Sequence, residues 1–177
     1  MAAPPEPGAS EGPVVVGVDG SDSSRAALRW AARHAERTGQ GLHVVLAWHL
    51  PADYGWPLPL PSDWRPEEDA RIVLEEEVAD VLGPGPHPGV TMTTRQGPAA
   101  QVLIDASRTA SMVVVASRGR GQLAGVLLGS VSEYLAAHAH CPVVVVHAGK
   151  TAATPTSPAR HKVLARSSTS HAAPRAG

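Results

Sequence analysis

The chain lacks several features that would each point to a particular class of protein. Phenylalanine is absent and aromatic residues make up only 3% of the 177 residues, so aliphatic side chains must build any core. Cys141 is the only cysteine, which excludes a disulfide framework and predicts a reducing compartment, the cytoplasm. No apolar run approaches the roughly 20 residues of a membrane-spanning helix. The net charge of -1 gives no argument for nucleic acid as a partner. We therefore expect neither a membrane nor a nucleic-acid partner.

The charge that is present is unevenly distributed along the chain. Residues 148–177 carry only basic charges, and residues 1–12 carry only acidic ones. Both segments are poor in large apolar side chains and cannot bury enough surface to offset the entropy of ordering. We predict a disordered N-terminal segment over 1–12, one folded domain over 13–147 and a disordered basic tail over 148–177.

Within the predicted domain, short β-branched runs alternate with helical patterns. Strands are expected over 13–18, 42–48, 89–95, 112–116 and 142–147, and helices over 21–38, 66–82, 98–109 and 130–139. This alternation predicts an α/β fold: an open five-stranded parallel sheet in the strand order 3-2-1-4-5, with helices on both faces. Such sheets bind ligands at the carboxyl ends of the strands, where the strand order reverses, here between the first and fourth strands.

The periodicity of two helices also predicts which side chains are buried. In the helix over 66–82, Leu74 and Val78 belong to an apolar stripe, while Glu75–Glu77 are expected to face solvent. In the helix over 130–139, Tyr134 and Leu135 are expected to point inward.

The segment after the fourth strand has the composition of a phosphate-binding loop. It contains Gly119, Gly121, Gly125 and Gly129, the cations Arg118 and Arg120, and the hydroxyls of Ser130 and Ser132 at the start of a helix. Glycines let backbone amides approach an anion, and a helix N-terminus adds partial positive charge. The alternative is a flexible loop that leads into a helix capped by Ser130.

Two features near the other strand ends leave their roles open. Asp19 follows the first strand, where its carboxylate can accept hydrogen bonds from a ribose or an adenine amine. It could instead cap the next helix, although Ser21 and Asp22 are better placed for that role. The aromatic and proline-rich segment 49–65 is either a lid over the site or a loop anchored by its own side chains.

Three motifs resemble those of the universal stress protein family, in its ATP-binding branch. They are Val16–Ser21 after the first strand, the signature G-x2-G-x9-G-[ST] over Ala116–Ser130, and His140–Val146 at the last helix–strand junction. The resemblance covers residues 13–147. One departure is Ala116, which replaces the first glycine of the signature, and its methyl group could crowd a ribose.

The resemblance implies a role for each matching residue. Asp19 would contact the adenosine portion of ATP, while Gly17, Ala47 and Val115 would line the adenine slot. The phosphates, with Mg2+ or Mn2+, would be held by the residues around the glycine-rich segment, namely Gly119, Arg120, Gly129, Ser130, Val131 and Ser132. The implied function is that of an ATP-binding module that regulates the stress response.

Two other functions remain open at this point, and both share the fold. One is a slow ATPase or nucleotide hydrolase, although Glu133 is the only acid near the glycine-rich segment. The other is a dimeric scaffold that binds no nucleotide. We also predict a homodimer through the last strand, Pro142–His147, because an uncharged run of valines at a sheet edge is normally covered.

Overall fold

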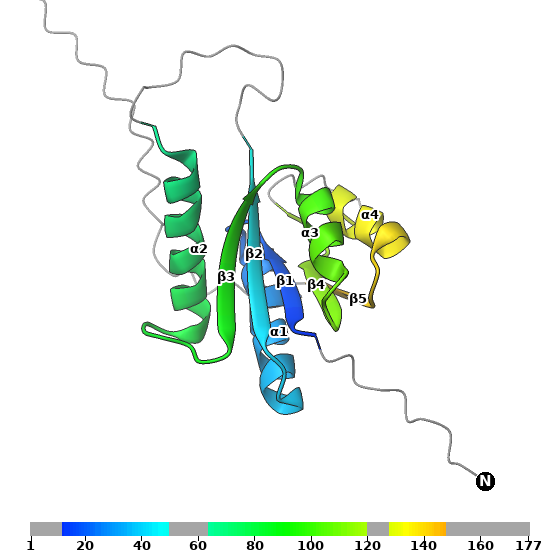
Figure 1. Cartoon of the computed structure of the whole chain (residues 1–177), viewed down its shortest axis with the longest axis horizontal. Coiled ribbons are helices and arrows are strands. Elements are labelled where there is room, and N and C mark those ends of the chain that lie inside the picture. The colour runs from blue at the N-terminus through cyan, green and yellow to red at the C-terminus, as the bar shows by residue number, and fades with distance from the viewer. Residues whose placement is uncertain (1–11, 50–63, 120–127, 148–177) are drawn as a thin grey trace, which may run out of the picture.

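A computed structural model describes residues 12–49, 64–119 and 128–147 of the chain (Figure 1). Several sequence predictions lie outside the described residues: the two terminal segments apart from Gly12, the segment 50–63, and Arg120 with Gly121 and Gly125.

The described residues form one five-stranded parallel sheet. Its strands are β1 (Val14–Val18), β2 (Leu42–Trp48), β3 (Val90–Gln96), β4 (Met112–Ala116) and β5 (Val143–Val146). Their order is β3-β2-β1-β4-β5, and every neighbouring pair runs parallel. This confirms the predicted fold class, and it puts β1 and β4 side by side at the point where the strand order reverses.

The central strands β1 and β4 are apolar on both faces, because helices cover both faces of the sheet there. Val14 and Val16 of β1 pack against α1 (Asp22–Thr38) and α2 (Pro66–Leu82), in the larger of two apolar clusters. Val15, between them, packs on the opposite face with residues of α3 (Ala99–Ser107) and α4 (Ser130–His138). Figure 1 shows α3 and α4 lying side by side. Continuous β-branched runs are typical of strands buried in this way.

The predicted elements all exist, with bounds that agree to within two residues. Two predictions about burial are wrong. Glu77 is only 1% exposed, because it lies on the side of α2 that meets α1. Tyr134 is 46% exposed and stacks on the ring of His138, whereas its neighbour Leu135 is fully buried as predicted. No helix among the described residues is long and apolar enough to cross a bilayer.

Candidate functional site

A cavity of about 250 Å³ opens where the carboxyl ends of β1, β2 and β4 meet the start of α4. Its walls include all nine of the predicted site residues that the structure describes. These are Gly17, Asp19, Ala47, Val115, Gly119, Gly129, Ser130, Val131 and Ser132. Residues from four separate elements are therefore gathered at one place, the point where parallel sheets of this kind hold their ligands.

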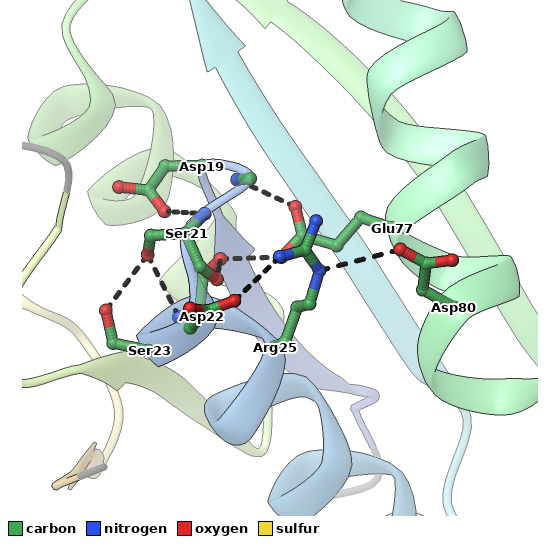
Figure 2. Close-up of polar contacts among 9 residues, drawn as sticks. Asp19, Ser21, Asp22, Ser23, Arg25, Glu77 and Asp80 are labelled. Atoms are coloured by element: carbon green, nitrogen blue, oxygen red, sulfur yellow. Dashed lines mark hydrogen bonds and ion pairs between the residues drawn. The ribbon is translucent and has the colours of Figure 1, made fainter. Parts of the chain in front are cut away.

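Asp19 lies at the centre of this arrangement and has both a local and a long-range contact. Its Oδ1 accepts a hydrogen bond of 3.0 Å from the backbone N–H of Ser21, which closes the turn after β1 (Figure 2). Its Oδ2 faces Gly119, where an added Cβ would lie only 2.7 Å away. The cap of α1 is Ser21, whose hydroxyl accepts from the N–H of Ser24 at 3.1 Å. The cap of α1 is therefore Ser21 and not Asp19.

The turn after β1 and the segment after β4 are also joined directly. The hydroxyl of Ser23 donates to the carbonyl oxygen of Arg118 at 2.8 Å. Together with the approach of Asp19 to Gly119, this contact holds two motifs about 100 residues apart in the sequence against each other. A residue larger than glycine at position 119 would displace the carboxylate.

The start of α4 presents backbone to the cavity. Its cap residue is Gly129, which makes no side-chain hydrogen bond, so the alternative of a cap by Ser130 is wrong. The N–H of Gly129 donates to the carbonyl oxygen of Ser117 at 2.7 Å, and Ser132 Oγ donates to the carbonyl oxygen of Gly129 at 2.8 Å. These two bonds fix the first turn, with Ser130–Ser132 lining the cavity. A helix end of this kind favours negative charge.

Another part of the cavity wall is apolar. It is lined by Gly17, Val45, Ala47, Leu103 and Val115. A Cβ at Gly17 would lie 2.7 Å from Leu103 Cδ1, so glycine is needed there for α3 to pack closely on β1. Small and β-branched side chains on three strand ends leave a slot that suits a planar ring.

Ala116 also lines the cavity, and it packs, partly buried, against one of the apolar clusters. It belongs with Val114 to the apolar cluster on the α1 and α2 face of the sheet, whereas Val115 belongs to the cluster on the α3 and α4 face. The side chain that replaces the first glycine of the signature therefore borders both the cavity and the core.

Glu77 is the residue near the site that the sequence analysis missed. From α2 it reaches the turn after β1, as Figure 2 shows, where its Oε2 accepts from the N–H of Gly20 at 2.8 Å. Its Oε1 lies 2.6 Å from Ser24 Oγ. Burial raises the pKa of the Glu77 carboxyl, opposed by its two hydrogen bonds and the nearby Arg25. A signal was available, since Glu77 lies on the stripe that Ala70, Leu74 and Val78 form at helical spacing.

The fold and the position of the cavity place the chain among the doubly wound α/β proteins. Residues 12–147 match the family model described as the universal stress protein family. The chain therefore belongs to that family.

Individual relatives agree with this assignment. The chain is 42% identical over 154 residues to a universal stress protein of Mycolicibacterium smegmatis, a match that covers 82% of this chain and 51% of the relative. It thus spans about half the length of the curated relatives that it matches.

Two solved structures show the same fold. One is the universal stress protein UspA from Lactobacillus plantarum, with 23% identity and a TM-score of 0.57 over 77% of this chain and 97% of that one. The other is a universal stress protein in complex with cAMP, with 25% identity and a TM-score of 0.51 over 78% of this chain and 99% of that one.

Proposed function

We propose that the chain binds an adenine nucleotide, with ATP as the preferred ligand, and acts as a nucleotide-dependent module of the stress response. The observation that carries this proposal is the meeting of Asp19 with Gly119 in one cavity, next to the glycine-capped start of α4. A planar base fits the apolar wall, the ribose hydroxyls fit the carboxylate of Asp19, and the phosphates fit the amides of Ser130–Ser132.

The related structure solved with cAMP supports a site for the adenine nucleotide class in this fold. Its ligand has a single phosphate, so the preference for ATP rests on the residues of this chain. Gly119 and the three first-turn residues of α4 all line the cavity, so more than one phosphate group could be contacted there.

The divalent cation of the proposed complex would depend mainly on the nucleotide. Asp19 is the only carboxylate among the described residues that line the cavity. The hydroxyls of Ser130 and Ser132 add two further oxygen atoms. Mg2+ usually keeps several waters and binds one or two protein oxygens together with substrate phosphates, and this donor set fits that pattern. Mg2+ or Mn2+ would then neutralise phosphate charge and orient the chain of phosphates.

The direct test is to denature the purified protein and identify any nucleotide that it releases, and then to titrate the emptied protein with ATP. We expect adenine nucleotide in the released fraction and saturable binding of ATP. Failure of both assays would overturn the proposal in favour of a scaffold without nucleotide. A single-turnover assay with labelled ATP distinguishes a binding module, which returns ATP intact, from a slow hydrolase.

We also propose that two chains pair through β5. This strand is at an edge of the sheet, and all four of its valines, Val143–Val146, are only half-buried. They alternate between the two apolar clusters, as predicted for a strand covered on both faces. An apolar edge of this kind is a template for pairing with an identical copy.

Sedimentation equilibrium at micromolar concentration tests this assembly. We expect a dimer for the wild type and a monomer or an aggregate for Val145→Asp, because a carboxylate would be buried unpaired. The matched control is Met92→Asp, which puts the same charge on β3 at the opposite edge, where Met92 is 46% exposed. A monomeric wild type would contradict the proposal.

A further inference from the structure

Glu77 is a buried carboxyl group that makes no direct contact with the residues assigned to the nucleotide. It is linked to one of them, Asp19, through the backbone of the turn after β1. Its side chain is 1% exposed, and it comes from α2, more than 50 residues away along the chain from the turn that it contacts. A buried ionisable group destabilises the fold unless it is hydrogen-bonded, so the presence of Glu77 and its contacts needs a physical explanation.

One of the two hydrogen bonds of Glu77 is to the backbone of Gly20. The N–H of Gly20 donates to Glu77 Oε2 at 2.8 Å, and Gly20 has a φ of 81°, a conformation that side chains rarely adopt. The peptide that carries this N–H also contains the carbonyl of Asp19. One residue further, the N–H of Ser21 donates to Asp19 Oδ1. The direction in which Asp19 points is therefore set by a turn that Glu77 holds from outside the cavity (Figure 2).

We propose that Glu77 is a positioning residue for the adenine nucleotide: it holds the Asp19–Gly20 turn from α2, so that the carboxylate of Asp19 faces the cavity. This inference rests on the proposed function. It assigns the role to the reach and hydrogen bonding of the Glu77 side chain, not to its charge.

The geometry around Ser24 explains why charge is not required. Ser24 Oγ lies within hydrogen-bond distance of two acceptors, Glu77 Oε1 at 2.6 Å and the carbonyl oxygen of Ser21 at 2.8 Å. A hydroxyl has one proton, so an ionised Glu77 leaves one of the two contacts without a hydrogen. A protonated Glu77 donates its own proton to Ser24 Oγ, and the Ser24 hydroxyl can then donate to the carbonyl oxygen of Ser21, so both contacts have a hydrogen. The other oxygen of Glu77 still accepts from the N–H of Gly20. Glutamine can do the same through its amide.

The charged groups that surround Glu77 come from three elements. Arg25 of α1 favours the ionised carboxyl, and Asp19 in the turn opposes it. Arg25 is in turn shared between Asp22 at 3.0 Å and Asp80 of α2 at 3.7 Å. The positive charge near Glu77 is thus already balanced by other carboxylates, and removing the charge of Glu77 leaves no unpaired cation.

Two substitutions separate reach from charge. Glu77→Asp keeps the charge but is one methylene shorter, so it loses the bond to Gly20; we expect ATP and cAMP to bind about tenfold more weakly, the usual cost of one such bond. Glu77→Gln loses the charge but keeps the reach, and we expect its affinities to stay within about threefold of the wild type. Glu76→Asp, at an exposed position on the same helix, is the matched control.

A double-mutant cycle with Asp19→Ala then tests whether Glu77 acts through Asp19. In the Asp19→Ala background we expect Glu77→Asp to have no further effect on ATP affinity, a result that general loss of stability would not give. Thermal melts establish that each variant is folded at the titration temperature. Should Glu77→Asp not fold, Glu77→Met, an apolar side chain of similar length, replaces it in the same cycle.

The outcomes are distinguishable. If wild type, Glu77→Asp and Glu77→Gln all bind ATP equally, the inference is wrong and the proposed function stands. Equal losses in Glu77→Asp and Glu77→Gln, or additive losses in the cycle, would also overturn the inference. A wild type that binds neither ATP nor cAMP would overturn the proposed function, and the inference with it.

Discussion

The turn that leads into α1 and the segment that leads into α4 both follow a central strand, yet they are held in different ways. The first is braced by side chains: Ser21 caps the helix, Asp19 closes the turn and Glu77 bonds Gly20 from another helix. The second ends at a glycine cap, Gly129, which offers no side chain of its own, and the N–H of Gly129 and the hydroxyl of Ser132 hold the first helical turn. The turn before α1 is held rigidly by side chains and is therefore preorganised to orient one group of a ligand. The start of α4 has a glycine cap, so its backbone amides remain available to bind an anion.

The difference between the two segments predicts that a negative charge added at the start of α4 has the largest effect on ATP affinity. Gly129→Glu puts a carboxylate where the phosphates are proposed to bind, and we expect ATP affinity to fall by at least about a hundredfold, or close to 3 kcal/mol. The fold should persist, because the atom nearest to an added Cβ at Gly129 is Ser117 O at 3.4 Å, and the next two, Arg118 Cα and Ser132 Oγ, lie at 3.6 and 3.8 Å. Calorimetric titration with ATP measures the loss, and circular dichroism checks the fold.

The control for this variant is Ala136→Glu, which adds the same charge to an exposed position of α4 away from the cavity. Its ATP affinity should equal that of the wild type. Unchanged ATP binding by Gly129→Glu would remove the phosphate role from the start of α4.

Removal of the Asp19 carboxylate is expected to have the next largest effect on nucleotide affinity. Asp19→Ala should weaken ATP and ADP equally, by about tenfold or about 1.5 kcal/mol, because it removes a contact to the adenosine portion and none to the phosphates. Parallel titrations with the two nucleotides measure this ratio. A loss much greater for ATP than for ADP would move Asp19 to the phosphate side of the site, and lower thermal stability with unchanged affinity would leave it only a structural role.

The buried hydrogen bonds that Glu77 of α2 makes to Gly20 and Ser24 also predict that stability depends on pH. Because burial raises the pKa of Glu77 above its ordinary value of 4.5, the folded state releases this proton at a higher pH than the unfolded state does. The stability that this residue contributes is therefore present at acid pH and is lost as pH rises through the raised pKa. Glutamine does not ionise, so Glu77→Gln does not lose this stability. Its free energy of unfolding should therefore rise relative to that of the wild type between acid and neutral pH.

Urea unfolding of both proteins across that pH range makes the comparison, with Glu76→Gln as the control at an exposed position. The control should follow the wild type at every pH. If the free energy of unfolding of Glu77→Gln instead fell relative to that of the wild type as pH rises, the direction of the pKa shift would be contradicted.

The smallest effect is expected at the departure from the family signature. Ala116→Gly restores the glycine, but the methyl group it removes packs in the core cluster on the α1 and α2 face. We expect ATP affinity to change by less than about twofold, while stability falls by about 0.5–1 kcal/mol from the added freedom of the unfolded chain. A large gain in affinity would show that the methyl group does crowd the ligand.

How far the sequence could predict this molecule depends on how local each signal is. The bounds of β2 and β4 follow directly from continuous apolar runs, and the placing of Asp19 beside Gly119 follows from the strand order. Glu77 was missed because it stands in a run of three glutamates, Glu75–Glu77, two of which are exposed. The third lies on the helical stripe of Ala70, Leu74 and Val78, the signal that the run of acidic residues obscured. Tyr134 was misplaced because α4 is short and meets its neighbours along one narrow side.

The central claim is that both segments hold one nucleotide, and amide chemical shifts test it most directly. In titrations of the wild type, ATP should move the resonances of Gly20 and Ser21 together with those of Ser130–Ser132, along a single binding curve. Adenosine, which has no phosphates, should move Gly20 and Ser21 and leave the first turn of α4 in place. If ATP moved only one of the two sets, or if the sets followed different binding curves, the claim of a shared site would be contradicted.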